Sequence, residues 1–381
     1  MTYTVGIVGT GPDPESRDRD GYAMAYRHAA GYGKLEDCSL IACADIVREN
    51  AEAFAKHHDL GQGSVYEDHR TMVREAEPDV VSVCVPPGAH AEIVIDCAEV
   101  GDVAAIHCEK PMATTWADCR GMVRACEEND VQLTIDHQRR FAVPVRKAKE
   151  LIDGGEIGDL RRFEWSEVNL FDAGSHLFDL CDFFLDGVHG KWALAGVDVA
   201  EENRWFGALN STRAIAHWEY ENGVQGIAST GDGDRKTAVD AYLRLVGTDG
   251  VIEIQPDDGP PLRVRTDGGW RTIDTDGERL YGPIPTKKRA ALRKLTNAIP
   301  GVESNHTSKP NYDRAIEHAI QSLSEGTEPT IAGKNALRGT ELVFACWESA
   351  RRGGTVNLPL DIEDNPLESL YEEGRTATQS V

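Results

Sequence analysis

The chain has 381 residues, 40% of them hydrophobic, which is too long for one ordinary domain and predicts two domains with buried cores. The formal net charge of −24 argues against nucleic acid and anionic membrane surfaces as partners, since both are polyanions. The sequence has no apolar run long enough for a membrane span and no recognisable signal peptide, so it predicts a cytoplasmic protein. Its nine cysteines include no C-x-x-C pair, which predicts reduced thiols without a disulfide framework or a metal site.

Residues 3–8 are expected to form a short buried strand, and a Gly-Thr-Gly turn follows it at once. A strand that runs into such a turn and then into a helix is typical of dinucleotide-binding folds, in which the backbone approaches the pyrophosphate of the cofactor. Here residues 12–20 interrupt the pattern before an alanine-rich helix that extends through residue 30. The residues expected to bind the cofactor in this segment are Gly9, Thr10, Gly11 and Gly21.

The inserted residues 12–20 contain four acids, which would be unfavourable beside a pyrophosphate unless they point to solvent. Arg17 or Arg19 in the same segment offers an alternative, in which a guanidinium clamps the phosphates.

Asp45 stands at the end of a second strand, expected over residues 39–44, and precedes a helix over residues 47–58. An acid at this position is placed to accept hydrogen bonds from the adenosine ribose and to repel a 2′-phosphate. The sequence therefore favours NAD over NADP, although the nearby Arg48 leaves NADP possible. Asp45 can also cap the helix, and the two roles are compatible.

Further strands and helices complete the first domain. Strands are expected over residues 80–85, 103–107 and 131–136, and helices over 89–100 and from Thr114 or Thr115 to 129. Continuous apolar strands that alternate with helices predict a parallel sheet covered on both faces, a Rossmann domain over residues 1–137. Ligands of such sheets bind beyond the carboxyl ends of the strands. The residues at those ends are Pro86, Pro87, Glu109, Lys110 and Pro111.

Beyond residue 137, many strands joined by short turns predict a second α/β domain over residues 138–361, with a largely antiparallel open sheet. Strands are expected over residues 161–168, 192–199, 214–230 (a hairpin turning at 221–223), 241–245, 251–254, 262–266 and 356–360. Helices are expected over 144–153, 287–298, 311–323 and 336–350, the last two packing back toward the first domain. Residues 362–381 are expected to form an acidic, frayed tail.

The sequence places the chemistry in the stretch from Asp172 to Asp179. If a helix opens there, Asp172, His176 and Asp179 share one face, because residues three and four apart are neighbours. An imidazole flanked by two carboxylates has a fixed ring and a raised proton affinity, which suits a general base near neutral pH. In the alternative reading Asp172 caps the helix, Asp179 makes a surface pair and His176 is structural.

Together these motifs resemble the glucose–fructose oxidoreductase, inositol dehydrogenase and rhizopine-catabolism (Gfo/Idh/MocA) family over residues 3–360. The resemblance implies a Rossmann domain, a second α/β domain whose open sheet often joins subunits into a homo-oligomer, and hydride transfer between NAD or NADP and a sugar- or polyol-like small molecule. The matching motifs are the N-terminal glycine turn, Val85-Pro86-Pro87 with His90, Glu109-Lys110-Pro111, Arg139-Arg140-Phe141 with the turn at 154–158, the 172–179 stretch and Leu358-Pro359-Leu360.

The resemblance also implies roles for individual residues. Lys110 is the active-site lysine, and Asp172 and His176 complete the catalytic group. In this scheme His176 takes the hydroxyl proton, Asp172 orients the imidazole and the Lys110 ammonium stabilises charge that develops on oxygen. Substrate binding is assigned to Lys110, Arg139, Asp172 and His176, and cofactor binding to Pro86, Pro87, His90, Glu109 and Lys110 beside the glycine turn and Asp45.

Two other functional classes stay open. One is a non-catalytic sensor that retains the cofactor fold, although a binding module has no need of Lys110, Asp172 and His176 together. The other is NAD-dependent elimination or glycoside cleavage, in which transient oxidation activates a neighbouring C–H bond and no net NADH forms.

The acidic residues are spread along the whole chain rather than gathered in one tail. Such a surface repels itself at low ionic strength, which predicts a protein adapted to high salt. An ordinary acidic protein is the alternative.

Overall fold

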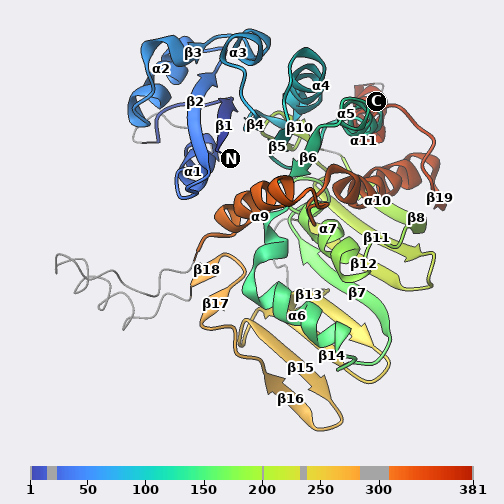
Figure 1. The fold of residues 1–381 in the computed structure, drawn as a ribbon. Coiled ribbons are helices and arrows are strands. Elements are labelled where there is room, and N and C mark those ends of the chain that lie inside the picture. Colours follow the sequence, from blue (N-terminus) through green and yellow to red (C-terminus); the bar gives the residue numbers. More distant parts are fainter. Residues whose placement is uncertain (1, 15–23, 200, 232–237, 284–308, 380–381) are drawn as a thin grey trace.

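The computed structural model describes residues 2–14, 24–199, 201–231, 238–283 and 309–379, and Figure 1 shows how they are arranged. The chain is built on two large sheets, one formed before residue 136 and one formed after residue 159. Gly21, Arg17, Arg19 and the basic helix expected over residues 287–298 lie outside the described residues.

The first sheet has six parallel strands in the order β3-β2-β1-β4-β5-β6. This is the strand order of a Rossmann sheet, in which the ligand binds where the order reverses, between β1 and β4. The predicted parallel sheet is therefore confirmed. Its strands are β1 (Tyr3–Val8), β2 (Cys38–Ala44), β3 (Val65–Tyr66), β4 (Val80–Val83), β5 (Ala105–Cys108) and β6 (Gln132–Ile135).

Two helices of this domain begin where a short polar side chain bonds a free backbone N–H group. Thr115 accepts a hydrogen bond from Asp118 N at 3.1 Å and caps one helix, and Asp68 caps another by accepting from Thr71 N at 2.8 Å. The helices are α1 (Met24–Tyr32), α2 (Arg48–His57), α3 (His69–Ala76), α4 (His90–Val100) and α5 (Trp116–Glu128), with 3₁₀ turns η1 (Gln62–Ser64), η2 (Pro87–Ala89) and η3 (Gln138–Phe141).

The second sheet has nine strands in the order β16-β15-β14-β13-β7-β12-β11-β8-β19. Every neighbouring pair is antiparallel except β7 and β12, so the predicted, largely antiparallel sheet is confirmed. Its strands are β7 (Leu160–Glu167), β8 (Gly190–Asp198), β11 (Arg213–Tyr220), β12 (Gln225–Gly231), β13 (Ala241–Gly247), β14 (Val251–Pro256), β15 (Leu262–Thr266), β16 (Gly269–Thr272) and β19 (Val356–Asn357). Two small hairpins pair β9 (Arg204–Trp205) with β10 (Ala208–Leu209), and β17 (Glu278–Arg279) with β18 (Gly282–Pro283).

The later helices are α6 (Val143–Asp153), α7 (Ser175–Phe184), α9 (Asn311–Glu325), α10 (Gly333–Arg352) and α11 (Pro366–Gln379). Of these helices, α9 and α10 contact elements of both halves of the molecule (Figure 1). Helix α9 packs on α1, so closely that a Cβ on Gly31 would lie 2.7 Å from Ile316 Cδ1. Helix α10 contacts β8 and α7 on one side and α5 on the other. Among the helices that the structure describes, none is both long and apolar enough to cross a bilayer.

The acidic C-terminal segment differs from the frayed tail that its composition predicts. Residues 366–379 form α11, which packs against α10. Leu367 is fully buried, and Glu368 pairs with Arg204 at 3.0 Å. Two buried apolar residues, Pro366 and Leu367, and an ion pair therefore hold a helix whose remaining residues are mostly polar.

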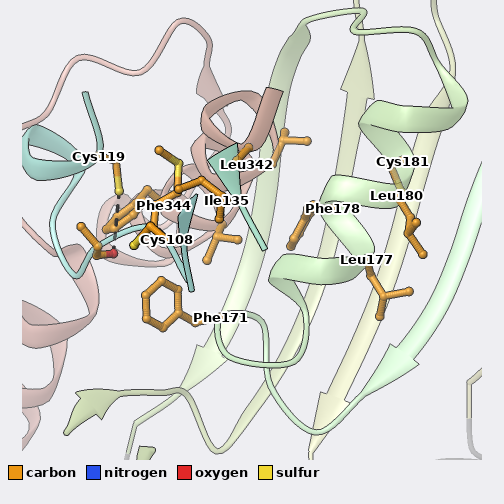
Figure 2. Close-up of a cluster of buried hydrophobic side chains, with 14 of the residues drawn as sticks. Cys108, Cys119, Ile135, Phe171, Leu177, Phe178, Leu180, Cys181, Leu342 and Phe344 are labelled. Carbon is orange, nitrogen blue, oxygen red and sulfur yellow. Dashed lines mark hydrogen bonds between the residues drawn. The ribbon is translucent and has the colours of Figure 1, made fainter. Parts of the chain in front are cut away.

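One apolar core extends across both halves of the molecule. Figure 2 shows Cys108 and Ile135, from the ends of β5 and β6, beside Phe171 and Phe344. Interiors of this kind are close-packed and deform little. The shared core therefore fixes the carboxyl end of β5 relative to the start of α7, and these two places carry the predicted catalytic residues.

Candidate functional site

The glycine turn after β1 leaves room above a closely packed backbone. Gly9 has a φ of 83°, and a Cβ there would lie 2.4 Å from Val85 Cγ1, so glycine is required where the turn approaches the loop after β4. Gly11 has a φ of 62°, yet a Cβ there would meet no atom of the described residues within 4 Å. The turn is thus close to the sheet on one side and open on the other, as a backbone cradle for a phosphate would be.

Asp45 faces this turn from the end of β2. Its Oδ2 accepts hydrogen bonds from Gly11 N at 2.9 Å and from Thr10 Oγ1 at 3.1 Å, and its Oδ1 accepts from Val47 N at 2.9 Å. The carboxylate therefore holds the chain before α2 and also lies beside the glycine turn. The next residue, Ile46, is 90% exposed.

His90 ties together the loops that follow β4 and β5. The ring is fully buried, with Nε2 2.8 Å from Val85 O and Nδ1 2.8 Å from Pro111 O. Burial lowers the pKa of His90. Both ring nitrogens face backbone carbonyls, so any effect of His90 on a cofactor passes through the positions of these loops. Pro86 is exposed at the start of η2, whereas Pro87 is buried.

Glu109 is turned inward, away from the open side of the sheet edge. Its Oε1 lies 3.0 Å from His28 Nε2, and its Oε2 accepts a hydrogen bond from Lys110 N at 3.3 Å. The side chain therefore supports the backbone of the loop from which Lys110 projects.

Lys110 and Asp172 meet across the two halves of the molecule. Lys110 Nζ donates to Asp172 Oδ1 at 3.1 Å and to Asp172 O at 3.0 Å, and the two side chains are 19% and 11% exposed. Asp172 N donates in turn to Asn210 Oδ1 at 3.2 Å. The ammonium and the carboxylate thus form a fixed, partly accessible pair at the carboxyl edge of the first sheet.

The surroundings of His176 correct the expectation of an imidazole between two carboxylates. Helix α7 begins at Ser175, so Asp172 lies in the preceding turn and its carboxylate goes to Lys110. The pKa of His176 is lowered well below its usual value by burial and by the positive charges of Arg139 and Lys110. The expected rise in proton affinity is wrong, because cations rather than carboxylates surround the ring.

Asp179 also pairs with a residue other than His176. Its carboxylate accepts from Arg140 Nε at 2.7 Å and from Arg140 Nη2 at 2.6 Å, and Arg140 Nη2 further donates to Asp182 at 3.0 Å. This buried, bidentate pair joins α7 to the η3 turn. Asp179 therefore anchors the helix that carries His176 and does not contact the imidazole.

A second imidazole, which the sequence did not indicate as a site residue, lies beside the first. The rings of His137 and His176 are 5.5 Å apart and nearly perpendicular, at 81°. Burial lowers the pKa of His137 to about 4. In the part of the chain that the structure describes, Nδ1 of each ring has no hydrogen-bond partner. Two neutral imidazoles, each with a buried Nδ1 that has no partner among the described residues, thus lie near the Lys110–Asp172 pair.

Arg139 supplies positive charge to the same place. Its guanidinium lies 5.2 Å from the centre of the Tyr242 ring and 5.0 Å from that of Tyr281, and it donates to the Tyr242 hydroxyl. The two tyrosines also line a surface hollow with Gln255 and Arg279. Sequence reasoning missed both tyrosines, because they come from distant segments that carry no local signal.

The sequence and the fold of the chain are also similar to those of known proteins. A model of the oxidoreductase family's NAD-binding Rossmann fold matches residues 4–137, and a model of the same family's C-terminal alpha/beta domain matches residues 161–358.

Several curated relatives span most of the chain. The chain is 33% identical over 378 residues to myo-inositol 2-dehydrogenase of Thermotoga maritima, a match that covers 93% of this chain and 98% of that protein. It is 28% identical over 343 residues to 2,7-anhydro-N-acetylneuraminate hydratase of Mediterraneibacter gnavus, covering 82% and 88%. Among solved structures, an oxidoreductase from Agrobacterium radiobacter in complex with NAD+, L-tartaric acid and magnesium has a TM-score of 0.71 at 20% identity, over 94% of this chain and 98% of that one. This last likeness shows the fold alone.

Proposed function

Since the chain belongs to the glucose–fructose oxidoreductase, inositol dehydrogenase and rhizopine-catabolism family of NAD-binding oxidoreductases, we propose that it transfers hydride between NAD or NADP and a sugar, a polyol or a related hydroxy compound. The observation that carries the proposal is the contact between Lys110 and Asp172 at 3.1 Å, beside His176, where the two halves of the molecule meet. An ammonium, a carboxylate and a neutral imidazole at one place provide the charge stabilisation and the proton acceptor that alcohol oxidation requires.

The residues near the first sheet's carboxyl edge fit a dinucleotide. The backbone of the Gly9–Gly11 turn would approach the pyrophosphate, since no described residue fills the space in front of Gly11. Asp45 would accept from the adenosine ribose, and the exposed Ile46 next to it offers an apolar contact for adenine. When bound, the nicotinamide supplies the hydride acceptor or donor. The carboxylate of Asp45 favours NAD, because it would repel a 2′-phosphate.

Residues of the chain would accept the proton, stabilise the developing charge and bind the substrate. His176 is held neutral, so it can accept the proton of a substrate hydroxyl. Lys110 donates to the same oxygen and stabilises the negative charge that develops there. Asp172 holds the ammonium in place rather than the imidazole, which revises the role that the resemblance implied. Arg139, clamped by Tyr242 and Tyr281, would bind another oxygen of the substrate.

Absorbance at the nicotinamide band, over a panel of sugars and polyols, tests the proposal directly. We expect Lys110→Ala to lower kcat by about 10²–10³-fold, the usual loss when one charge-stabilising donor is removed, while cofactor binding persists. The matched control is Lys34→Ala, which removes another lysine–aspartate contact between the two halves of the chain, with Asp313 at 2.5 Å. Equal turnover by both variants would remove Lys110 from the mechanism. Cofactor binding without turnover on any substrate would favour a sensor.

A second candidate reaction is supported by the similarity to a hydratase. The same lysine and imidazole could serve an NAD-dependent addition or elimination in which oxidation is transient. Chromatography of the reaction mixture measures product, and absorbance measures NADH. Product that forms without net NADH would distinguish this reaction from simple dehydrogenation.

The exposed face of the second sheet supports a homo-oligomer. Ile215 is 70% exposed, Leu194 43% and Ile227 40%. The register places His217 opposite both Leu194 and Ile227, and Ile215 lies two residues from His217, so the three apolar side chains share one face. Contiguous apolar side chains on a sheet face are typical of a contact between subunits.

A further inference from the structure

A second group of titratable side chains lies next to the loop of Glu109, and the proposed hydride transfer does not use it. His28 comes from α1, His107 from β5 and Asp136 from the end of β6, and their exposed fractions are 0%, 2% and 0%. One potential ligand atom of each lies within 4.8 Å of the others. Glu109 adds a fourth, since its Oε1 is 3.0 Å from His28 Nε2.

The hydrogen bonds of His107 determine where its lone pair points. The Thr134 hydroxyl donates to Ile106 O at 3.2 Å, so it accepts from His107 Nδ1 at 2.9 Å. In a neutral ring Nε2 then carries the lone pair. Asp136 Oδ1 faces this nitrogen at 3.9 Å.

Neither His107 Nε2 nor Asp136 Oδ1 has a hydrogen-bond partner within the described ranges of the chain. Two buried acceptors that face each other without a donor between them are unfavourable, because each has lost its hydration. A cation placed between them would satisfy both.

We propose that His28, His107, Asp136 and Glu109 bind one divalent transition-metal ion, for which Zn²⁺ is the best match. Imidazole nitrogens and carboxylate oxygens bind Zn²⁺ at about 2.0–2.2 Å in a tetrahedron, so ligand atoms of one ion are roughly 3.3 Å apart. The separations of 3.7 Å between His28 Nε2 and Asp136 Oδ2 and of 3.9 Å between His107 Nε2 and Asp136 Oδ1 need only small side-chain shifts.

The groups around the two imidazoles suit this role. His28 Nδ1 lies 2.8 Å from Ser82 Oγ, and His107 Nδ1 lies 2.9 Å from Thr134 Oγ1. Metal-binding histidines commonly use the second ring nitrogen in this way, which fixes the tautomer and the ring orientation. Both Nε2 atoms are thereby directed to the centre of the cluster.

Charge also balances when the ion binds. A ligand set of two neutral imidazoles and two carboxylates would carry two negative charges, which cancel the charge of Zn²⁺. The site would join α1, β5 and β6 beside the loop of Lys110.

Metal content tests this inference independently of activity. The purified full chain would be stripped with dipicolinate, equilibrated with Zn²⁺, desalted and measured by mass spectrometry, with the visible spectrum of a Co²⁺-loaded sample as a second readout. We expect about one zinc ion per chain, a Co²⁺ spectrum of tetrahedral type and a higher unfolding temperature with Zn²⁺.

Asp136→Asn and His107→Gln should bind less than about a tenth of an equivalent, because each removes one ligand. The control is Asp96→Asn, which removes a His–Asp contact elsewhere in the domain, with His69 at 2.9 Å, and should bind zinc like the unchanged protein. Equal zinc in all variants would overturn the proposal. If the variants do not fold, the zinc content of the unchanged protein still tests the proposal. Zinc near zero after reloading would overturn it and would mean that a water molecule or a proton fills the cluster.

Discussion

His176 is held neutral by its surroundings, since burial, Arg139 and Lys110 all disfavour the imidazolium. A base of this kind is weaker than one supported by a carboxylate, but it stays unprotonated in acid, where an ordinary histidine would be charged. In the proposed reaction the nearby ammonium of Lys110 would compensate, because it lowers the proton affinity of the hydroxyl group that His176 deprotonates.

The pH dependence of the reaction follows from this arrangement. The pKa of His176 lies well below 6.5 in the folded protein, so the neutral base persists as the pH falls through 6.5. We expect the acid limb of kcat/KM that belongs to His176 to lie well below pH 6.5, and His176→Asn to lower kcat by about 10²–10⁴-fold and abolish that limb. Steady-state rates from pH 4 to 9 would check it. An acid limb near 6.5 that survives in the variant would contradict the assignment.

In the proposed function, Asp45 determines the preference between NAD and NADP through its charge. Asp45→Asn keeps an acceptor for Gly11 N and Thr10 Oγ1 but removes the negative charge. We expect the preference for NADH over NADPH to fall at least about tenfold, because the repulsion of the 2′-phosphate is lost. Fluorescence titration of both cofactors measures the ratio of dissociation constants. The control is Asp102→Asn, which changes an exposed carboxylate of the same domain and should leave that ratio unchanged. An unchanged ratio in the Asp45→Asn variant would contradict this explanation.

The contacts between candidate site residues were predicted more accurately from the sequence than the charged groups that surround those residues. Motif order was enough to bring Lys110 and Asp172 together, as the contact at 3.1 Å shows. Helical spacing, by contrast, relates His176 only to residues of its own segment. Arg139 and Tyr242 reach the site from other elements, and no periodicity in the chain encodes that meeting.

At the scale of elements, the apolar strands were predicted well because their burial on both faces leaves a continuous signal in the sequence. Strand β3 and helix α3 were missed: β3 has only two residues, and α3 follows it directly. Helix α11 was missed because its charged residues conceal the buried Leu367 that holds it. Very short strands, such as β3, and helices held by a few tertiary contacts, such as α11, are thus elements that sequence patterns fail to indicate.

The second sheet presents one face to solvent, and the proposed homo-oligomer depends on it. We expect Ile215→Lys to dissociate the oligomer, because it places a charge in the middle of the apolar face formed with Leu194 and Ile227. Light scattering coupled to size-exclusion chromatography measures the mass. Val47→Lys, which changes an exposed apolar residue of the first domain, should keep the oligomer. A monomeric unchanged protein would refute the proposal, and an Ile215→Lys oligomer would place the contact elsewhere.

At the scale of the whole molecule, the net charge of −24 opposes the compact state. Exposed ion pairs such as Arg48–Glu52 at 2.9 Å and Arg204–Glu368 at 3.0 Å offset part of this repulsion. Salt weakens both effects, but exposed pairs contribute only about 0–1 kcal/mol each. Because the acids outnumber the bases, 64 against 40, screening should remove more repulsion than attraction.

We therefore expect the unfolding midpoint to rise as KCl increases toward molar concentration, where the Debye length falls from about 10 Å at 0.1 M to about 3 Å. Calorimetry over this range would measure the midpoint. Sucrose at equal osmolality is the control, since an excluded uncharged solute stabilises compact states without screening charge. A rise in KCl that exceeds the rise in sucrose would assign the effect to charge. A midpoint that stays level or falls toward molar KCl would mean that the acidic surface is tolerated in ordinary salt and is no adaptation to a salty environment.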